Sequence, residues 1–372
     1  MFEEKLLHKK DSLNNYIGLI WKLLVTLSVL LQLSVGSVQG LAIYDDNYHL
    51  IARHVLSIII GIFLFSLIKY MKKELLIRYT KSLMWGSLIF LIMAKLEGLA
   101  TNGSVRWLSC GPVKCQPSEF VKISVILWIA MQAYNYREEL GSIKNLGLFA
   151  GPPLMLALVV LDQPDFGTSV LIIGIIGIML AFSRISFPLL SISGLLGVGG
   201  IVSVLLTQEY RNRRFDAWLE YRKSGCVTLE DKLGPCWQLL QSKSAIGSGG
   251  LVGIGPGNSY ARWGYLPSPH SDMVGSIIGE EYGFIGLLLI TVLYTAFVVL
   301  LFIFSSYADN DFDKFIRIGF TAWIFLQTVF NLGGIVGLLP ITGIVLPFIS
   351  YGGSAMVANF ICLGFVLRDY QR

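Results

Sequence analysis

Long apolar stretches alternate with short polar segments along most of the 372-residue chain. A helix needs about 20 mainly apolar residues to cross a bilayer. The pattern predicts an all-α polytopic membrane protein with about ten transmembrane helices, at residues 17–38, 53–70, 79–98, 117–134, 146–162, 166–183, 186–206, 273–303, 316–338 and 349–367. Charged residues interrupt the third stretch and the start of the eighth, so eight to ten helices are expected.

One segment breaks this alternation within what we expect to be a single membrane domain, residues 1–372. Residues 207–272 are of mixed polarity and lie between the seventh and eighth predicted helices. A segment of this length and polarity does not fit a bilayer core, because its backbone and charged groups need water or protein partners. We therefore expect one large loop outside the membrane.

Composition supports the membrane assignment, since 54% of the residues are hydrophobic, only 14% are charged and the mean hydropathy is +0.66. A soluble globular domain has a more polar balance. The net charge of +5 is explained by basic residues in the short loops and in the long one. It gives no reason to expect a nucleic-acid partner, whereas contact with membrane lipids follows directly.

The distribution of Lys and Arg predicts the orientation. These residues concentrate in the N-terminal tail, in the segment 69–81 and near the C-terminal end, whereas Asp45 and Asp46 occupy the first inter-helix loop. Basic loops stay in the cytoplasm, so both termini are expected there and the long loop outside. The first apolar stretch is too long for a cleavable signal and lacks a small-residue cleavage site, so it is expected to remain as a helix.

Four of the five cysteines, Cys110, Cys115, Cys226 and Cys236, fall in segments assigned to the outer face. In an oxidising compartment they could form two disulfides, with three possible connectivities. The simplest pairs the first two with each other and the last two with each other. Free thiols are the alternative, and zinc is less favoured because no CxxC spacing or paired His accompanies these residues.

The polar segment 101–122 holds two pairs of candidate functional residues. Glu119 and Lys122 are three residues apart, so they share one face of a helix. They either neutralise each other at the membrane edge or mark a substrate path, because ionisable groups within a bilayer face cavities. Arg106 and Trp107 either bind a phosphate and a sugar face or anchor the chain at the interface.

Two further segments admit both a structural and a functional interpretation. Asp162 and Asp165 lie on a turn with Pro and Gly that needs no function to explain it, although two carboxylates there can bind a cation or orient a neighbour. The glycine-rich segment 241–259 lacks the Gly-Lys-Ser/Thr ending of a nucleotide-binding loop. We expect a loop whose backbone approaches another surface and whose amides can receive an anion; a flexible loop is the alternative.

The segment 266–286 gathers a His and three carboxylates before a long apolar run. Asp272 lies where the long loop meets the eighth predicted helix, and it either caps that helix or acts chemically. A carboxylate at a partly dehydrated surface is well placed to be a general base. Glu280 and Glu281 come about two turns later, where facing lipid is costly, so at least one should meet a cation or a cavity.

Six motifs follow one another along nearly the whole chain: NGSVRW…GPVKCQPSEFVK, QPDFGTS, WQLLQSKSAIGSGGLVGIGPGNS, YLPSPHSD, IIGEEYGFIG and NLGGIVGLLPITGIVLPFISYGGSAM. Together, and in this order, they resemble the SEDS family of cell-wall synthases, which includes FtsW, RodA and SpoVE. The strings GNS and IIGEEYG resemble the FtsW branch more than the RodA branch.

The resemblance implies a ten-helix glycosyltransferase that polymerises lipid II into peptidoglycan strands at the outer face of the bacterial cytoplasmic membrane. The family's essential Asp corresponds to Asp272, which would accept the proton of the acceptor hydroxyl while undecaprenyl diphosphate leaves with inversion. Cations would stabilise that diphosphate, and the candidates are Arg106, Arg213, Lys243 and Arg262. The remaining expected substrate-binding residues are Trp107, Glu119, Lys122, Asp165, Ser248 and His270.

The resemblance also bears on cofactors, partners and role. No cofactor is certain; a divalent cation, Mg or Mn, could bridge the diphosphate, but no dedicated site is visible in the sequence. A class B penicillin-binding transpeptidase is the implied partner, with other division or elongation proteins, and the FtsW-like strings favour division. The chain departs from the family pattern at Ser271, which replaces Thr, and at Ser268, Ala261 and Gly264, where acidic or amide residues are usual.

Two other classes of function compete with the polymerase. A lipid II flippase or other transporter would depend mainly on residues within the membrane such as Glu119 and Lys122 and on inverted repeats. No convincing inverted repeat is visible, which favours the enzyme. A scaffold that recruits division proteins without catalysis would tolerate the loss of Asp272.

Overall fold

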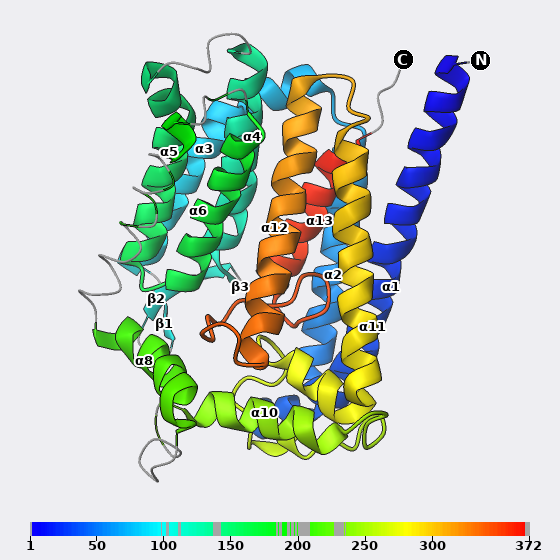
Figure 1. The fold of residues 1–372 in the computed structure, drawn as a ribbon, viewed down its shortest axis with the longest axis vertical. Helices are drawn as coiled ribbons and strands as arrows, with labels where there is room; N and C mark the ends of the chain where they lie inside the picture. Colours follow the sequence, from blue (N-terminus) through cyan, green and yellow to red (C-terminus); the bar gives the residue numbers. More distant parts are fainter. Residues whose placement is uncertain are drawn as a thin grey trace.

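The computed structural model describes residues 2–97, 99–101, 104–110, 113–136, 143–183, 185, 188–191, 194, 197, 199, 209–226, 234 and 236–368. Most of these residues are helical, as the apolar pattern predicts (Figure 1). The helices that stand along the long axis of the molecule are α1 (Phe2–Tyr44), α2 (His49–Lys69), α3 (Lys73–Glu97), α4 (Pro117–Asn135), α5 (Ile143–Asp162), α6 (Phe166–Ala181), α11 (Val274–Ser305), α12 (Asp311–Ile335) and α13 (Gly353–Val366).

These nine helices correspond to nine of the ten predicted spans. The predicted span at 186–206 lies largely outside the described residues. Among the described helices, α1, α2, α3, α11 and α12 are long and apolar enough to cross a bilayer on their own, and α5, α6 and α13 are shorter apolar helices. The chain is therefore a multi-pass membrane protein with a mainly helical fold.

Local sequence chemistry explains where several helices begin. Pro117 occupies the first turn of α4, where its missing N–H costs nothing. Asp165 precedes α6 and accepts a hydrogen bond from the Thr168 amide at 3.3 Å. Asn310 precedes α12 and accepts one from the Asp313 amide at 3.0 Å. Each cap satisfies an amide that has no partner within its own helix.

Helix α4 lies at the centre of the bundle. All but one of the residues from Pro117 to Ala133 are buried, Phe120 being half-buried, and α4 contacts α3, α5, α6, α12 and α13. A helix that is buried on every face places any charged side chain it carries inside the protein. This position decides the surroundings of Glu119 and Lys122.

The last two predicted spans differ from the observed helices. Helix α12 ends at Ile335 and α13 begins at Gly353, so residues 336–352 form a non-helical connection, here called the α12–α13 loop. The 14 residues of α13 rise only about 21 Å, less than the roughly 30 Å of a bilayer core. The predicted spans, which end at 338 and begin at 349, overlap this loop by a few residues, because apolar composition does not mark where a helix ends beside a buried loop.

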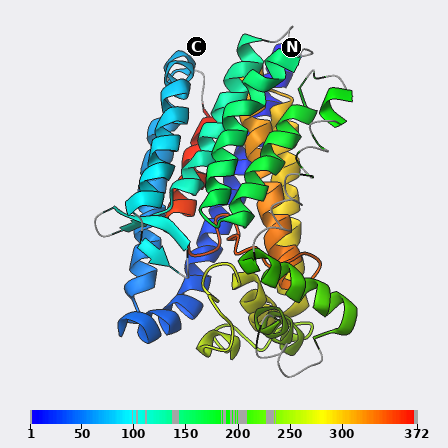
Figure 2. The ribbon, with the colours of Figure 1, turned by 90° about the vertical axis from the view of Figure 1, so that its left-hand side faces the viewer.

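A small antiparallel sheet precedes α4, and the apolar pattern did not predict it. Its strands are β1 (Leu99–Thr101), β2 (Ser104–Cys110) and β3 (Val113–Cys115), in the order β1-β2-β3. Two of the strands have only three residues, too few to show an alternating pattern. Figure 2 shows the sheet at the edge of the bundle, nearer the end that carries α10 (Trp237–Gly249).

The predicted loop 207–272 contains helices of its own: α8 (Glu209–Ser224), α10 (Trp237–Gly249) and the short η1 (Ala261–Trp263). Helices α8 and α10 lie across one end of the bundle, whereas both chain termini lie at the opposite end (Figure 1). This placement agrees with an even number of crossings and with termini on one side. The first half of the glycine-rich segment, expected to be a loop, is the end of α10.

The rest of the glycine-rich segment approaches α11 closely, as predicted. A side chain at Gly253 would meet the Glu281 carbonyl at 2.1 Å, and Gly253 adopts a φ of 86°. Helix α11 is itself interrupted at Gly283, with a φ of 67° that favours glycine. The interruption frees the amides of Phe284 and Ile285, which donate to the carbonyls of Gly250 and Leu251.

One of the two predicted local disulfides is present. Cys226 and Cys236 are bonded and buried, and both contact Ala217 of α8. The other predicted pair cannot be assessed, because the side chain of Cys110 lies outside the described residues. The observed bridge joins the end of α8 to the start of α10.

We expect Cys226 and Cys236 to be recovered as one linked peptide pair when non-reduced protein from an oxidising compartment is digested for mass spectrometry. Closing a loop of this size restricts the unfolded chain and stabilises the fold by about 2–3 kcal/mol. The double variant Cys226→Ala, Cys236→Ala should therefore unfold at lower temperature, with Cys362→Ala in α13 as control. Full alkylation of both cysteines without reductant would contradict the assignment.

Candidate active site

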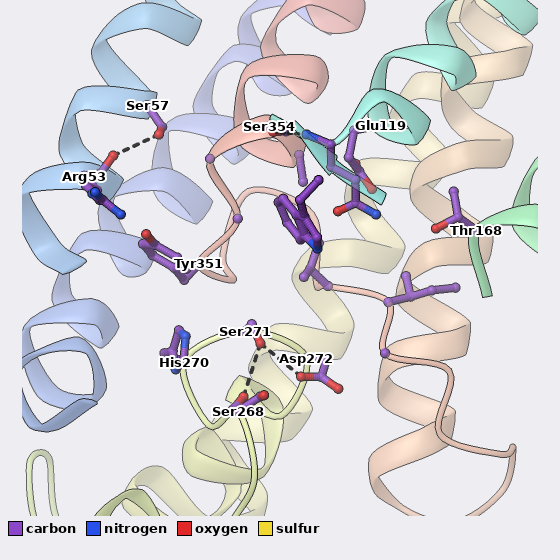
Figure 3. Close-up of a pocket in the computed structure, with 18 of the residues that line it drawn as sticks. Arg53, Ser57, Glu119, Thr168, Ser268, His270, Ser271, Asp272, Tyr351 and Ser354 are labelled. Atoms are coloured by element: carbon purple, nitrogen blue, oxygen red, sulfur yellow. Dashed lines mark hydrogen bonds between the residues drawn. The ribbon is translucent and has the colours of Figure 1, made fainter. Parts of the chain in front are cut away.

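A cavity of about 390 Å³ opens where α2, α4, the start of α6 and the two loops beside α11 and α13 meet. Figure 3 labels ten residues of the cavity wall, and their side chains surround a common space. The polar and charged wall residues are Tyr44, Arg53, Ser57, Trp107, Gln116, Glu119, Lys122, Asp165, Thr168, Ser268, His270, Ser271, Asp272, Tyr351 and Ser354. Six of the residues predicted from sequence therefore share one cavity, although they come from four distant parts of the chain.

Asp272 lies at the cavity wall immediately before the N-cap of α11, which is Met273. Its side chain is 8% exposed, and the Ser271 hydroxyl donates to its Oδ1 at 3.0 Å. The amide of Asn331 in α12 donates to the Asp272 backbone carbonyl at 2.7 Å. The carboxylate is thus held on a fixed backbone at the rim of a polar space, as a general base requires.

His270 and Tyr351 form one side of the cavity. The Tyr351 amide donates to the His270 carbonyl at 2.9 Å, and the two rings meet edge to face at 5.3 Å. Burial lowers the pKa of His270 to about 4, so its ring is neutral at neutral pH. Burial also raises the pKa of the Tyr351 phenol. Both side chains therefore act there as neutral hydrogen-bonding groups.

Glu119 and Lys122 form the predicted ion pair in α4, with 2.7 Å between Oε2 and Nζ. Lys122 also donates to Gln327 Oε1 at 3.4 Å and lies 4.3 Å from the centre of the Trp323 ring. Lys122 is 1% exposed, yet both members line the cavity. The two opposite charges can thus compensate each other and still contact a ligand. Both interpretations drawn from sequence, a self-neutralising pair and part of a substrate path, are compatible with this position.

Asp165 lies in the wall beside α4 with its own set of partners. Gln116 Nε2 donates to its Oδ2 at 3.1 Å, and the Ser118 hydroxyl does so at 3.2 Å. Asp165 also caps α6 and is 5% exposed. These contacts account for the carboxylate structurally. Its role in substrate binding, and that of Trp107, stays a prediction.

Sequence reasoning missed Arg53, which reaches the cavity from α2 and lies beside Tyr351 in its wall (Figure 3). A guanidinium binds phosphate oxygens well. Arg53 is therefore placed for the diphosphate-binding role that was predicted from sequence for other cations. A signal was available: Arg53 begins a long apolar stretch on the outer side of the membrane, where the positive-inside bias gives no reason for a cation. Tyr351 and Ser354 lie in the last of the six motifs, but nothing in that motif singled them out.

Three predicted cationic or polar residues lie away from the cavity, so their assignment as substrate contacts is not supported by position. Lys243 lies 4.6 Å from the centre of the Tyr221 ring, and Ser248 donates to the Ala245 carbonyl at 2.8 Å. Arg262 donates to the Ser34 carbonyl and hydroxyl, each at 3.0 Å. All three belong to α10 or the segment after it, which packs across the end of the bundle rather than into the cavity.

Arg106 and Arg213 cannot be placed, because their side chains lie outside the described residues, although their backbones belong to β2 and α8. Glu280 and Glu281 are buried but do not belong to the cavity wall. Glu280 accepts hydrogen bonds from the Ser259 hydroxyl and from the amides of residues 260 and 261. Glu281 accepts one from Ser34 at 2.6 Å.

The amides that bind the Glu280 carboxylate belong to residues 260 and 261, just after the glycine-rich segment, so the expectation that the segment's own amides receive an anion stays a prediction. Among the residues that the structure describes, neither Glu lines this cavity or forms an ion pair with a cation. Among the described residues, no three His, Cys, Asp or Glu side chains gather as a metal site. The carboxylates that face the cavity are Asp165, Asp272 and the paired Glu119.

Comparison with known proteins places the chain among bacterial cell cycle proteins. A family model covering FtsW, RodA and SpoVE, described as "Cell cycle protein", matches residues 14–370. The chain is 32% identical to stage V sporulation protein E of Bacillus subtilis (strain 168), over 97% of each chain. It is 31% identical to the probable peptidoglycan glycosyltransferase FtsW of Wigglesworthia glossinidia brevipalpis, over 95% of this chain and 93% of the relative.

Two solved structures share the fold. The first shows "structural coordination of polymerization and crosslinking by a peptidoglycan synthase complex" and matches with a TM-score of 0.77 and 23% identity, over 94% of this chain and 95% of that one. The second is the rod shape determining protein RodA of Thermus thermophilus, with a TM-score of 0.68 and 23% identity over 94% of each chain.

We expect Glu119 and Lys122 to be coupled, so that replacing one should destabilise the protein more than replacing both. A buried charge left without its partner costs about 3–5 kcal/mol, whereas removing a pair together is often close to neutral. Unfolding midpoints of Glu119→Gln, Lys122→Met and the double variant test this in one detergent. Equal losses in all three variants would show that the two charges are not coupled.

Proposed function

The chain belongs to the FtsW/RodA/SpoVE family of SEDS proteins, and from that membership we propose that it is a peptidoglycan glycosyltransferase that polymerises lipid II. The observation that carries the proposal is the convergence of Asp272, Arg53 and Lys122 on one cavity. A base and cations in a common space are what transfer of a sugar from a diphosphate requires.

In the proposed reaction, Asp272 accepts the proton of the acceptor hydroxyl. The hydroxyl oxygen forms a bond to the anomeric carbon of the donor, the bond from that carbon to the diphosphate oxygen breaks, and undecaprenyl diphosphate leaves with the bonding electrons. Arg53 takes the place of Lys243 and Arg262 as the cation for the diphosphate, because it lies in the cavity wall and they do not. His270 and Tyr351 supply neutral hydrogen bonds to sugar or peptide groups.

A divalent cation, Mg or Mn, is a further part of the proposal. Asp272 and Asp165 are wall residues with oxygen ligands of the kind these hard cations take. A diphosphate supplies the remaining oxygens in many enzymes of nucleotide and polyprenyl chemistry. Bound to the diphosphate, such a cation would neutralise charge that develops on the leaving group.

The cellular role that we favour is synthesis of the division septum, with the cytoplasmic membrane as location and both termini in the cytoplasm. Similarity to FtsW proteins and FtsW-like strings in the sequence support the first point. Similarity to a sporulation protein supports a role in spore envelope synthesis almost equally. Basic residues at the end of the bundle that carries the termini support the orientation.

The partner that we propose is a class B penicillin-binding transpeptidase, which would crosslink the strands made here. The supporting observation is the fold shared with a structure described as a peptidoglycan synthase complex for polymerization and crosslinking. Other division or elongation proteins would join this pair. A flippase remains the competing function, and it would require Glu119 and Lys122 more than Asp272.

We expect Asp272→Asn to abolish most glycan synthesis while leaving expression and partner binding intact. The amide keeps the size and much of the hydrogen bonding of the carboxylate but cannot accept the hydroxyl proton, and a general base contributes about 10²–10⁴-fold in rate. Consumption of purified lipid II by the reconstituted complex, read by glycan chain length, is the measurement. Asp272→Glu should recover little, because a displacement of about 1 Å can cost about 10²-fold.

The matched control is Asp162→Asn, a carboxylate at the end of α5 that does not line the cavity and pairs with Lys95. It should polymerise lipid II at the unsubstituted rate. Near-normal turnover by Asp272→Asn would remove Asp272 as the base. Loss of lipid II translocation in Glu119→Gln with unchanged polymerisation by Asp272→Asn would favour the transporter.

A further inference from the structure

Helix α12 turns a column of polar side chains towards the cavity wall. Trp323, Gln327 and Asn331 are four residues apart and therefore lie on one helix face. Trp323 Nε1 donates to Gln327 Oε1, and Gln327 Nε2 donates to the Val345 carbonyl at 2.7 Å. The column thus connects the surroundings of Lys122 to the α12–α13 loop.

Asn331 ends this column and joins two separate segments of the cavity wall. Its Nδ2 donates to the backbone carbonyl of Asp272 at 2.7 Å and to that of Ile344 at 2.8 Å. A primary amide has two N–H groups, so one side chain satisfies both carbonyls. Asp272 and Ile344 both line the cavity, although 72 residues of sequence separate them.

Neither of these carbonyls takes part in a regular helix or strand, and Asn331 donates to both. The first turn of α11 uses the carbonyl of Met273, which accepts from the Ser276 amide at 3.0 Å, so the Asp272 carbonyl lies outside the helix. Ile344 follows Gly343, whose φ of 76° turns the backbone out of any regular structure. Buried carbonyls without a donor are strongly unfavourable, and Asn331, at 4% exposure, is buried beside them.

We propose that Asn331 is a positioning residue for the reaction, which fixes the backbone of Asp272 against the α12–α13 loop and so sets where the carboxylate stands. This inference rests on the proposed role of Asp272. Asn331 is not among the described residues that line the cavity, so it acts through Asp272 and Ile344 rather than on the substrate. Its loss would release both wall segments at once.

The test is lipid II polymerisation by the purified complex carrying Asn331→Leu. Leucine has the same number of side-chain heavy atoms with the same branching, so the variant removes the two hydrogen bonds and keeps the branched shape, with a somewhat larger side chain. Because displacement of a catalytic group by about 1 Å can cost about 10²-fold, we expect kcat to fall by about 10- to 100-fold. The KM for lipid II should stay within about threefold, since the substrate contacts are intact.

The matched control is Asn359→Leu in α13. Asn359 is 1% exposed, its Oδ1 has no hydrogen-bond partner among the described residues, and it does not line the cavity. The same chemical change there should lower kcat by less than about threefold. A merely structural role for Asn331 predicts that both variants lower the unfolding temperature while turnover per folded molecule is unchanged.

Unchanged kcat in Asn331→Leu, or an equal fall in Asn359→Leu, would overturn the proposal. If Asn331→Leu does not assemble, Asn331→Ser removes the same amide with a smaller polar side chain, and the same fall in kcat is expected. The same assay distinguishes the proposed function of the protein from the proposed role of Asn331. Failure of the unsubstituted complex to polymerise lipid II removes the proposed function, whereas normal turnover of the Asn331 variants in an active complex removes only the role of Asn331.

Discussion

The structure depends on one constraint: peptide groups that leave a helix inside an apolar bundle must find hydrogen-bond partners within the protein. The α12–α13 loop, residues 336–352, is where this constraint is strongest, because apolar helices surround it. Side chains supply the partners. Gln327 and Asn331 donate to its carbonyls from α12, Tyr294 donates from α11 and Ser28 donates from α1. Three helices are thereby tied to one irregular segment.

The same constraint creates the cavity. A continuous helix through residues 336–352 would pair its own peptide groups and fill the cavity with side chains. The loop instead leaves polar groups at the edge of the cavity. Asp272 reaches this edge because its segment is bonded to the loop, through Asn331 and through the bond between His270 and Tyr351. The site is therefore built from backbone contacts between two loops, and the helices act as the frame that supplies their donors.

Charge balance within the cavity follows from the position of each group. Lys122 is neutralised by Glu119 on the same helix face, at 2.7 Å. Arg53 stands on the other side, where its neighbour Tyr351 is a neutral phenol whose pKa is raised by burial. Glu280 contributes no charge to this space, because it is absent from the cavity wall and accepts hydrogen bonds from residues 259 to 261.

Features set by neighbours in sequence could be predicted from the sequence alone. Runs of apolar residues determined nine observed helices, the i to i+3 spacing determined the Glu119–Lys122 pair, and short separation favoured the disulfide between Cys226 and Cys236. Asp272 was found by its place between loop and helix and by the family motif around it. These signals are local, since helix periodicity and loop closure act over a few residues.

Only the tertiary structure decided which distant residues meet. Arg53 and Tyr351 lie far from each other in sequence, yet packing of α2 against α13 brings them to the same wall. Lys243 and Arg262 carry the right charge, but α10 packs across the end of the bundle and holds them away from the cavity. A charge has no periodic signature, so its partner depends on how whole helices pack, and that packing is set by contacts between residues far apart in the chain.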